Sequence, residues 1–125
     1  MTGSDGLLRS ISDLENALFQ CVSIVTDDAD DHRREMVQMR RSLTQKTAEV
    51  LELGLLSFEH EDDCHAFRAA HSKLRTAIAL HQSNWPISSF TPADPRYEAS
   101  LREMRSAYAA FIDWVRAALR KSARA

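Results

Sequence analysis

A chain of 125 residues is long enough to fold as one domain, residues 1–125, around a buried core. Its hydrophobic content of 44% and charged content of 27% are ordinary for a folded domain, and a net charge of −2 provides no basic surface for nucleic acid. No apolar run approaches the roughly 20 residues that span a bilayer, and residues 1–6 lack the pattern of a signal peptide. We therefore expect a cytoplasmic protein that binds neither nucleic acid nor membranes.

The first predicted helix spans about residues 5–27 and follows a loose tail at residues 1–4. Its apolar residues recur at intervals of three and four, which places them on one face of a helix. These residues are Leu7, Ile11, Leu14, Leu18, Cys21 and Val25. The aspartates between residues 27 and 31 should end this helix, because like charges repel within a helix but suit the start of the next one. We therefore expect a turn near Ala29.

The second predicted helix covers about residues 31–53. Its apolar seam consists of Met36, Met39, Leu43, Val50 and Leu53. A basic patch lies off this seam and consists of Arg33, Arg34, Arg40 and Arg41. A solvated helix face is the structural interpretation of this patch, and a site for an acidic partner is the functional one.

The residues that follow, 54–57, decide the architecture. Gly54 suits a left-handed cap at the end of a helix, with Leu55 as the apolar residue that often follows such a cap. Ser57 can then cap the next helix with its hydroxyl oxygen. The alternative is one helix over about residues 31–83, since the heptad spacing continues through this segment and a single glycine costs only about 1 kcal/mol. That long helix would give an elongated dimer.

The third predicted helix spans about residues 58–82 and the fourth about residues 95–121. Asp94 and Pro95 are typical of a helix start, because aspartate accepts a free backbone N–H and proline fits the first helical position. The inner face of the third helix is marked by Phe67, Ala70, Leu74, Ala77, Ile78 and His81. The apolar stripe of the fourth consists of Tyr97, Leu101, Met104, Tyr108, Phe111, Ile112, Val115 and Leu119. Four helices of similar length predict an all-α, up-down four-helix bundle.

Aromatic residues outside the stripes are candidates for a docking surface. The predicted loop at residues 83–94 contains Trp85 and Phe90, and its prolines stop helices. These aromatic rings are expected to pack over the end of the bundle; if exposed, they would offer an apolar surface to a partner. Trp114 falls beside the stripe of the fourth helix, so we expect part of its ring at the surface.

A metal site has little basis in the residue spacing. His60 and Cys64 are four residues apart on one helix face, which suits zinc, but two ligands do not complete a tetrahedral site. A di-iron bundle needs a Glu-x-x-His pair from each of two helices, and the nearest match, Asp62-x-x-His65, occurs once. We therefore predict no cofactor and no metal, with His60 and Cys64 as the only candidate ligands.

Residues 68–75 read Arg-Ala-Ala-His-Ser-Lys-Leu-Arg and place His71 within a helix. This stretch resembles the active helix of histidine-phosphotransfer domains, which are four-helix bundles of about this size. The resemblance implies that His71 accepts a phosphoryl group while Lys73 and Arg75 offset its charge. The family motif is His-x-Leu-Lys-Gly; here leucine comes one position late and Arg75 replaces the glycine. A buried, hydrogen-bonded histidine is the structural interpretation.

No glycine-rich phosphate loop, nucleophile elbow or metalloprotease motif is present in the sequence. We therefore predict a non-catalytic module that binds another protein, or a second copy of itself, in signalling or regulation. The predicted partner-binding residues are Arg33, Arg34, Arg40, Arg41, Trp85, Phe90 and Trp114. A homodimer would use the apolar residues Leu55, Leu56 and Phe58. Phosphotransfer through His71 and metal binding are the alternative functions.

Overall fold

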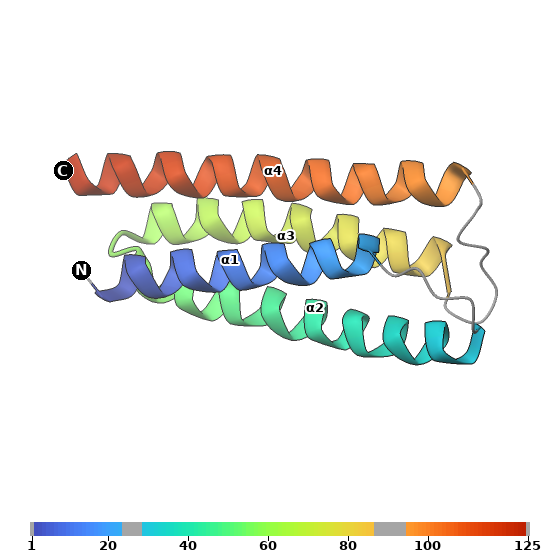
Figure 1. Ribbon diagram of the computed structural model, residues 1–125. Coiled ribbons are helices and arrows are strands. Elements are labelled where there is room, and N and C mark those ends of the chain that lie inside the picture. Colours follow the sequence, from blue (N-terminus) through green and yellow to red (C-terminus); the bar gives the residue numbers. More distant parts are fainter. Residues whose placement is uncertain (1, 24–28, 87–94, 125) are drawn as a thin grey trace.

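The computed structural model contains four helices that run alternately up and down (Figure 1). They are α1 (Thr2–Ser23), α2 (Ala29–Ser57), α3 (Glu61–Asn84) and α4 (Pro95–Arg124). The structure describes the backbone of residues 2–23, 29–86 and 95–124, and the side chains of residues 5–18, 33–86 and 95–121. The start of α1 and the end of α4 lie at the same end of the bundle (Figure 1). The predicted all-α, up-down four-helix bundle is confirmed.

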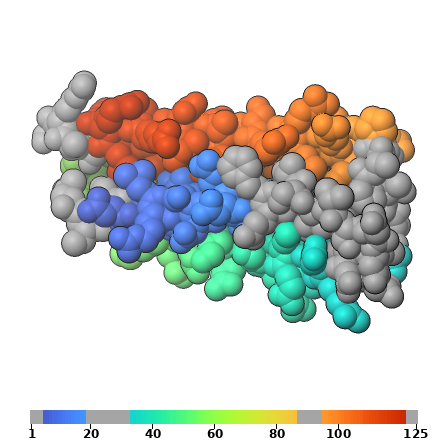
Figure 2. Space-filling view, viewed as in Figure 1, coloured from blue at the N-terminus to red at the C-terminus, as the bar shows by residue number. Residues whose placement is uncertain are grey.

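The four helices form two close pairs. α1 packs closely on α2 and α3 on α4, whereas α2 and α3, like α1 and α4, meet less closely. Figure 2 shows one face of the molecule, on which α1 lies between α4 and α2. The bundle therefore has two tight interfaces and two looser seams, and a looser seam is where side chains leave room for a groove.

The ends of the helices differ from the predicted ends by a few residues. α1 begins at Thr2, so the predicted loose tail is wrong for residues 2–4. The predicted end of the first helix at residues 24–27 lies outside the described residues. α3 continues to Asn84, and the N–H of Trp85 then closes its end by donating to the carbonyl of His81 at 3.0 Å.

The turn between α2 and α3 lies at residues 58–60, after the segment where we expected it. Ser57 ends α2, and its hydroxyl donates to the main-chain oxygen of Leu53 at 2.7 Å, so it does not cap the next helix. His60 takes the capping position with an extended backbone, and its side chain makes no capping hydrogen bond to the helix. Because the chain reverses here, the alternative of one helix over residues 31–83 is wrong, and so is the elongated dimer built on it.

Gly54 does not end α2, which corrects the predicted left-handed cap. It lies inside the helix, and no glycine in the described residues has a positive φ. A β-carbon at this position would overlap the ring of Phe67 on α3. That ring is fully buried, and three other aromatic rings lie within 6.1 Å of it between centroids, those of Phe58, Phe111 and Trp114. Gly54 therefore admits an aromatic side chain between the helices.

The predicted apolar stripes form the core of the bundle. The confirmed core residues are Leu7, Ile11, Leu14, Leu18, Met36, Leu43, Val50, Phe67, Leu74, Ile78, Tyr97, Leu101, Met104, Tyr108, Phe111, Ile112 and Val115. Phe58, which we expected at a dimer surface, is also buried, whereas Leu56 is 80% exposed. Among the helices as described, none combines the length and the apolar character that a membrane crossing requires.

Candidate functional site

The predicted arginine patch divides into two parts. Arg40 turns toward the end of α3, where its guanidinium donates to the main-chain oxygens of Gln82, at 3.5 Å, and Trp85. Since the last turn of a helix leaves carbonyl oxygens without partners, Arg40 acts as a structural cap of α3. The exposed members of the patch are Arg33, Arg34 and Arg41. We call these three residues the arginine surface.

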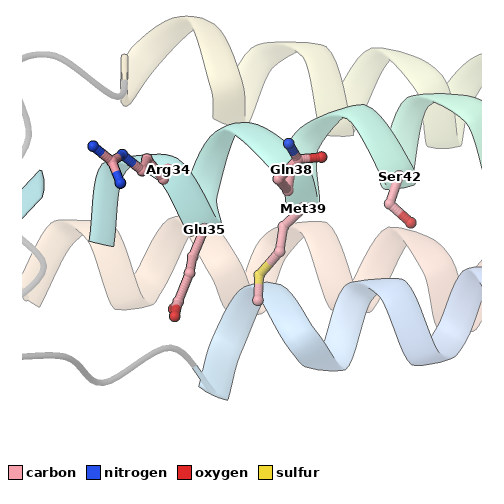
Figure 3. Close-up of a pocket in the computed structure, with 5 residues that line it drawn as sticks. All are labelled: Arg34, Glu35, Gln38, Met39 and Ser42. Atoms are coloured by element: carbon pink, nitrogen blue, oxygen red, sulfur yellow. The ribbon is translucent and has the colours of Figure 1, made fainter. Parts of the chain in front are cut away.

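An open hollow lies beside the arginine surface on the side of α2 that faces α1 (Figure 3). Glu35 and Met39 point toward α1, while Arg34 points to another side of the helix (Figure 3). Gln38 and Ser42 complete the lining. The hollow contains one carboxylate and one cation, so its charge favours neither an acidic nor a basic ligand.

The aromatic residues predicted for docking are partly enclosed by the bundle. Trp85 is half-buried and packs edge-on against Tyr97, with ring centroids 5.4 Å apart. Trp114 is also half-buried, and its ring lies 6.1 Å from that of Phe58. Phe90 lies outside the described residues. Both tryptophans therefore contribute to packing and expose only part of their rings.

His71 is buried, with 4% of its surface exposed. Its Nε2 atom lies 2.8 Å from the main-chain oxygen of Thr47, and since a carbonyl oxygen only accepts, Nε2 carries the proton and donates it. Burial lowers the pKa of His71, the hydrogen bond to Thr47 opposes this shift, and the positive charge of Arg75 adds to it. Lys73 and Arg75 are exposed, but the nitrogen they would assist is enclosed. This geometry opposes phosphotransfer through Nε2 and favours the structural interpretation.

His60 precedes the first turn of α3 as its capping residue, and Cys64 lies within that first turn. His60 is exposed, and the thiol of Cys64 lies 3.4 Å from the main-chain oxygen of Phe58 and 3.8 Å from that of Leu55. Acidic residues 61–63 follow the cap, where carboxylates suit the positive end of the helix. Within the part of the chain whose side chains are described, no three residues of the types His, Cys, Asp and Glu gather as metal ligands would.

A groove that we did not predict from the sequence lies between α2 and α3. Its volume is about 290 Å³. The lining residues are Thr44, Thr47, Ala48, Leu51, His71, Arg75, Ile78, Ala79 and Gln82. Ile78 is buried and Leu51 partly so, whereas Ala48 and Ala79 are exposed and too short to close the groove. The groove therefore has an apolar floor and low walls, with Arg75 at its edge.

The two helices beside this groove contain long stretches with basic residues and no acidic ones. Residues 36–48 of α2 and 64–84 of α3 contain no Asp or Glu. The cations in these two stretches are Arg40, Arg41, Lys46, Arg68, Lys73 and Arg75. Because the whole chain has a net charge of −2, the excess of positive charge in these two stretches is balanced by acidic residues elsewhere in the sequence. The acid-free stretches are the one signal in the sequence that could have pointed to the groove.

No match to this chain was found among protein-family models, curated proteins or solved structures. Of the described residues that line the groove, only His71 and Arg75 are ionisable. His71 already donates its Nε2 proton to Thr47, and a guanidinium is too basic to exchange protons near neutral pH. The groove thus combines an apolar recess with the guanidinium group of Arg75, which suits binding better than acid–base catalysis.

Proposed function

We propose that this protein is a non-catalytic module that binds another protein through the arginine surface and the neighbouring groove between α2 and α3. The partner presents carboxylates, because guanidinium groups pair with them through two parallel hydrogen bonds. Binding takes place in the cytoplasm, in signalling or regulation, as the sequence leads us to expect. The observation that carries the proposal is the apolar groove set within two stretches of chain that have cations and no acids.

This combination differs from an ordinary solvated helix face. Solvated faces usually intersperse both signs of charge, so that each cation has a carboxylate one helical turn away. Here Arg41 and Arg75 have no carboxylate within ion-pair distance among the described side chains. Arginine around an apolar centre is the composition that protein interfaces favour.

A charge-reversal experiment tests the proposal. The test variant carries Arg33→Glu, Arg34→Glu and Arg41→Glu. The matched control carries Arg102→Glu, Arg116→Glu and Arg120→Glu, three exposed arginines of α4. Both variants change the net charge by the same amount, so a difference between them reports the position of the charges.

Proteins that bind the chain in native lysate are captured by cross-linking and quantified by mass spectrometry. We expect at least one acidic protein to be captured by the wild type and by the α4 variant, and about tenfold less by the α2 variant. If both variants captured equally less of the acidic protein than the wild type, only overall charge would matter, and the proposal would then be abandoned. It would also fail if the wild type enriched no protein at all.

A further inference from the structure

The groove between α2 and α3 adjoins a second, more open hollow whose described lining comes from α2 alone. This second hollow is lined by Val37, Arg40, Arg41, Thr44 and Gln45. The two hollows share Thr44, so together they extend along α2 from Val37 to Leu51. At a rise of 1.5 Å per residue this distance is roughly 21 Å, which is the length of a helix of about 14 residues.

The shape of the groove suits a helix as its occupant. α2 and α3 meet less closely than the helices of the tight pairs, and Ala48 and Ala79 leave the space between them open. Leu51 and Ile78 line the same groove with apolar side chains, which a bound ligand would contact. An amphipathic helix places apolar residues at i, i+3, i+4 and i+7 on one face, and that face fits a recess between two parallel walls.

The positive charges beside the groove favour an acidic occupant. Arg41 and Arg75 are both exposed; Arg41 lines the adjoining hollow on α2, and Arg75 on α3 lines the groove. Carboxylates flanking the apolar face of a bound helix would lie beside these guanidinium groups. Exposed ion pairs add little to affinity, but they set specificity and speed association. Burial of the apolar face would supply most of the affinity.

Gln82 provides an independent indication of a ligand. It lines the groove, and its Nε2 atom is buried without a hydrogen-bond partner in the described part of the chain. A buried donor without an acceptor is costly, so native structures rarely leave one unsatisfied. Because this atom is itself enclosed, a carboxylate or main-chain oxygen of an occupant would satisfy it only after the Gln82 side chain turned toward the groove.

We infer that the groove binds an acidic amphipathic helix of about 14 residues from the partner protein. Its apolar face lies on Leu51 and Ile78, and its carboxylates lie beside Arg41 and Arg75. This inference rests on the proposed function and specifies which element of the partner is bound.

A set of synthetic peptides tests the inference on the full chain. The probe is a fluorescein-labelled peptide of about 14 residues, with leucine at the i, i+3, i+4 and i+7 positions of one face and glutamate elsewhere. One control peptide has the same composition in an order that scatters the leucines around the helix, and another replaces glutamate by lysine. By fluorescence anisotropy, we expect the probe to bind about tenfold more tightly than either control.

A groove-filling variant locates the binding site. Ala79→Phe places a ring in the recess, whereas Ala110→Phe places the same ring on an exposed position of α4. Because both alanines are exposed, both variants should fold, which circular dichroism checks. We expect Ala79→Phe to weaken probe binding about tenfold or more and Ala110→Phe to leave it unchanged. Equal affinities for the two variants would place binding elsewhere and overturn the inference.

The peptide controls separate failure of the inference from failure of the proposed function. If the scattered acidic peptide binds as tightly as the probe, the amphipathic helix is overturned, but an acidic partner is still supported. If an RNA oligonucleotide displaces the probe at lower concentration, the groove binds polyanions and the inference fails. If no acidic peptide binds, the inference fails as well, and the capture experiment with the α2 charge variant decides the proposed function on its own.

Discussion

The Nε2 atom of His71 on α3 donates a hydrogen bond to the main-chain oxygen of Thr47 on α2, across 2.8 Å. The two helices meet less closely than the tight pairs, so this bond adds a polar link across one of the two looser seams. The hydroxyl of Thr47 donates in turn to the main-chain oxygen of Leu43 at 2.6 Å, which satisfies a second buried polar group. Only a neutral ring suits this site, because a protonated ring would be a buried charge near Arg75.

The two buried histidines, His71 and His81, should make the bundle less stable in mild acid. Burial lowers the pKa of His71, and burial together with the charge of Arg40 lowers the pKa of His81 from 6.5 to about 4. Below pH 6.5 the unfolded chain therefore binds protons that the folded chain does not. For His81 the free energy of unfolding should fall as the pH falls from about 6.5 toward 4, by up to about 1.4 kcal/mol per pH unit, and His71 should add a fall in the same direction. Urea-induced unfolding at several pH values measures this slope.

A double variant shows whether these two histidines cause the pH dependence of the free energy of unfolding. His71→Gln with His81→Gln removes both titrating rings and should flatten the dependence between pH 6.5 and about 5, where most carboxylates stay ionised. The variant should also be less stable at neutral pH, because the bond to Thr47 is disturbed. An unchanged slope would assign the acid sensitivity to other groups.

Gly54→Ala should destabilise the bundle although alanine is the better helix former. The substitution gains about 1 kcal/mol in helix propensity. The added β-carbon overlaps the fully buried ring of Phe67, and forcing extra volume into a packed core typically costs about 1–3 kcal/mol, with rings on several sides leaving little room to relax. Taken together, these two effects should lower the free energy of unfolding by up to about 2 kcal/mol, which urea-induced unfolding measures.

Gly6→Ala is the matched control, because Gly6 lies within α1 and has nothing within 4 Å of its added β-carbon. This variant should be as stable as the wild type or more stable by up to about 1 kcal/mol. Adding Phe67→Leu to Gly54→Ala should cost less than the sum of the two single changes, since a smaller side chain relieves the overlap. Strict additivity would show that the two residues do not compete for space.

The helices and their buried faces could be predicted because their signal is local. In α1 and α4 the apolar residues repeat with the helical period and few exceptions, so the same residues that mark the stripe form the core. Gly54 shows where local reasoning fails. A glycine serves equally as a left-handed cap and as a space for a neighbouring side chain, and only the position of Phe67 distinguishes the two uses.

The candidate site could be predicted only in part, because it depends on which helices become neighbours. The acid-free stretches can be read from the sequence, but their meeting across one groove requires the packing of α2 against α3. Arg40 illustrates the same limit. It belongs to the basic patch by sequence, yet it turns to cap the end of α3 and donates to the main-chain oxygen of Gln82, 42 residues further along the chain.

Leu74→Ala should remove about 2–5 kcal/mol from the free energy of unfolding. Leu74 is 1% exposed, so its truncation loses apolar burial and leaves a cavity. Leu80→Ala is the same chemical change on the same helix at a position that is 57% exposed, and it should alter stability by no more than about 0.5 kcal/mol. Thermal or urea-induced unfolding compares the two. Similar losses for both variants would contradict the burial of Leu74.

Tyr108 should ionise at higher pH than an exposed tyrosine. It is buried, and its hydroxyl donates to the carboxylate of Glu15 on α1 at 3.1 Å. Burial first, and then the hydrogen bond to Glu15 and its negative charge, raise the pKa of Tyr108 above 10.0. The folded chain therefore keeps a proton that the unfolded chain releases, so stability from this group is complete below pH 10 and falls as the pH rises further.

The Tyr97→Phe variant leaves Tyr108 as the only tyrosine, and its ultraviolet titration should show no ionisation near pH 10 while the bundle stays folded. A reversible midpoint close to 10 would mean that the ring lies in solvent and that the contact between α1 and α4 is absent.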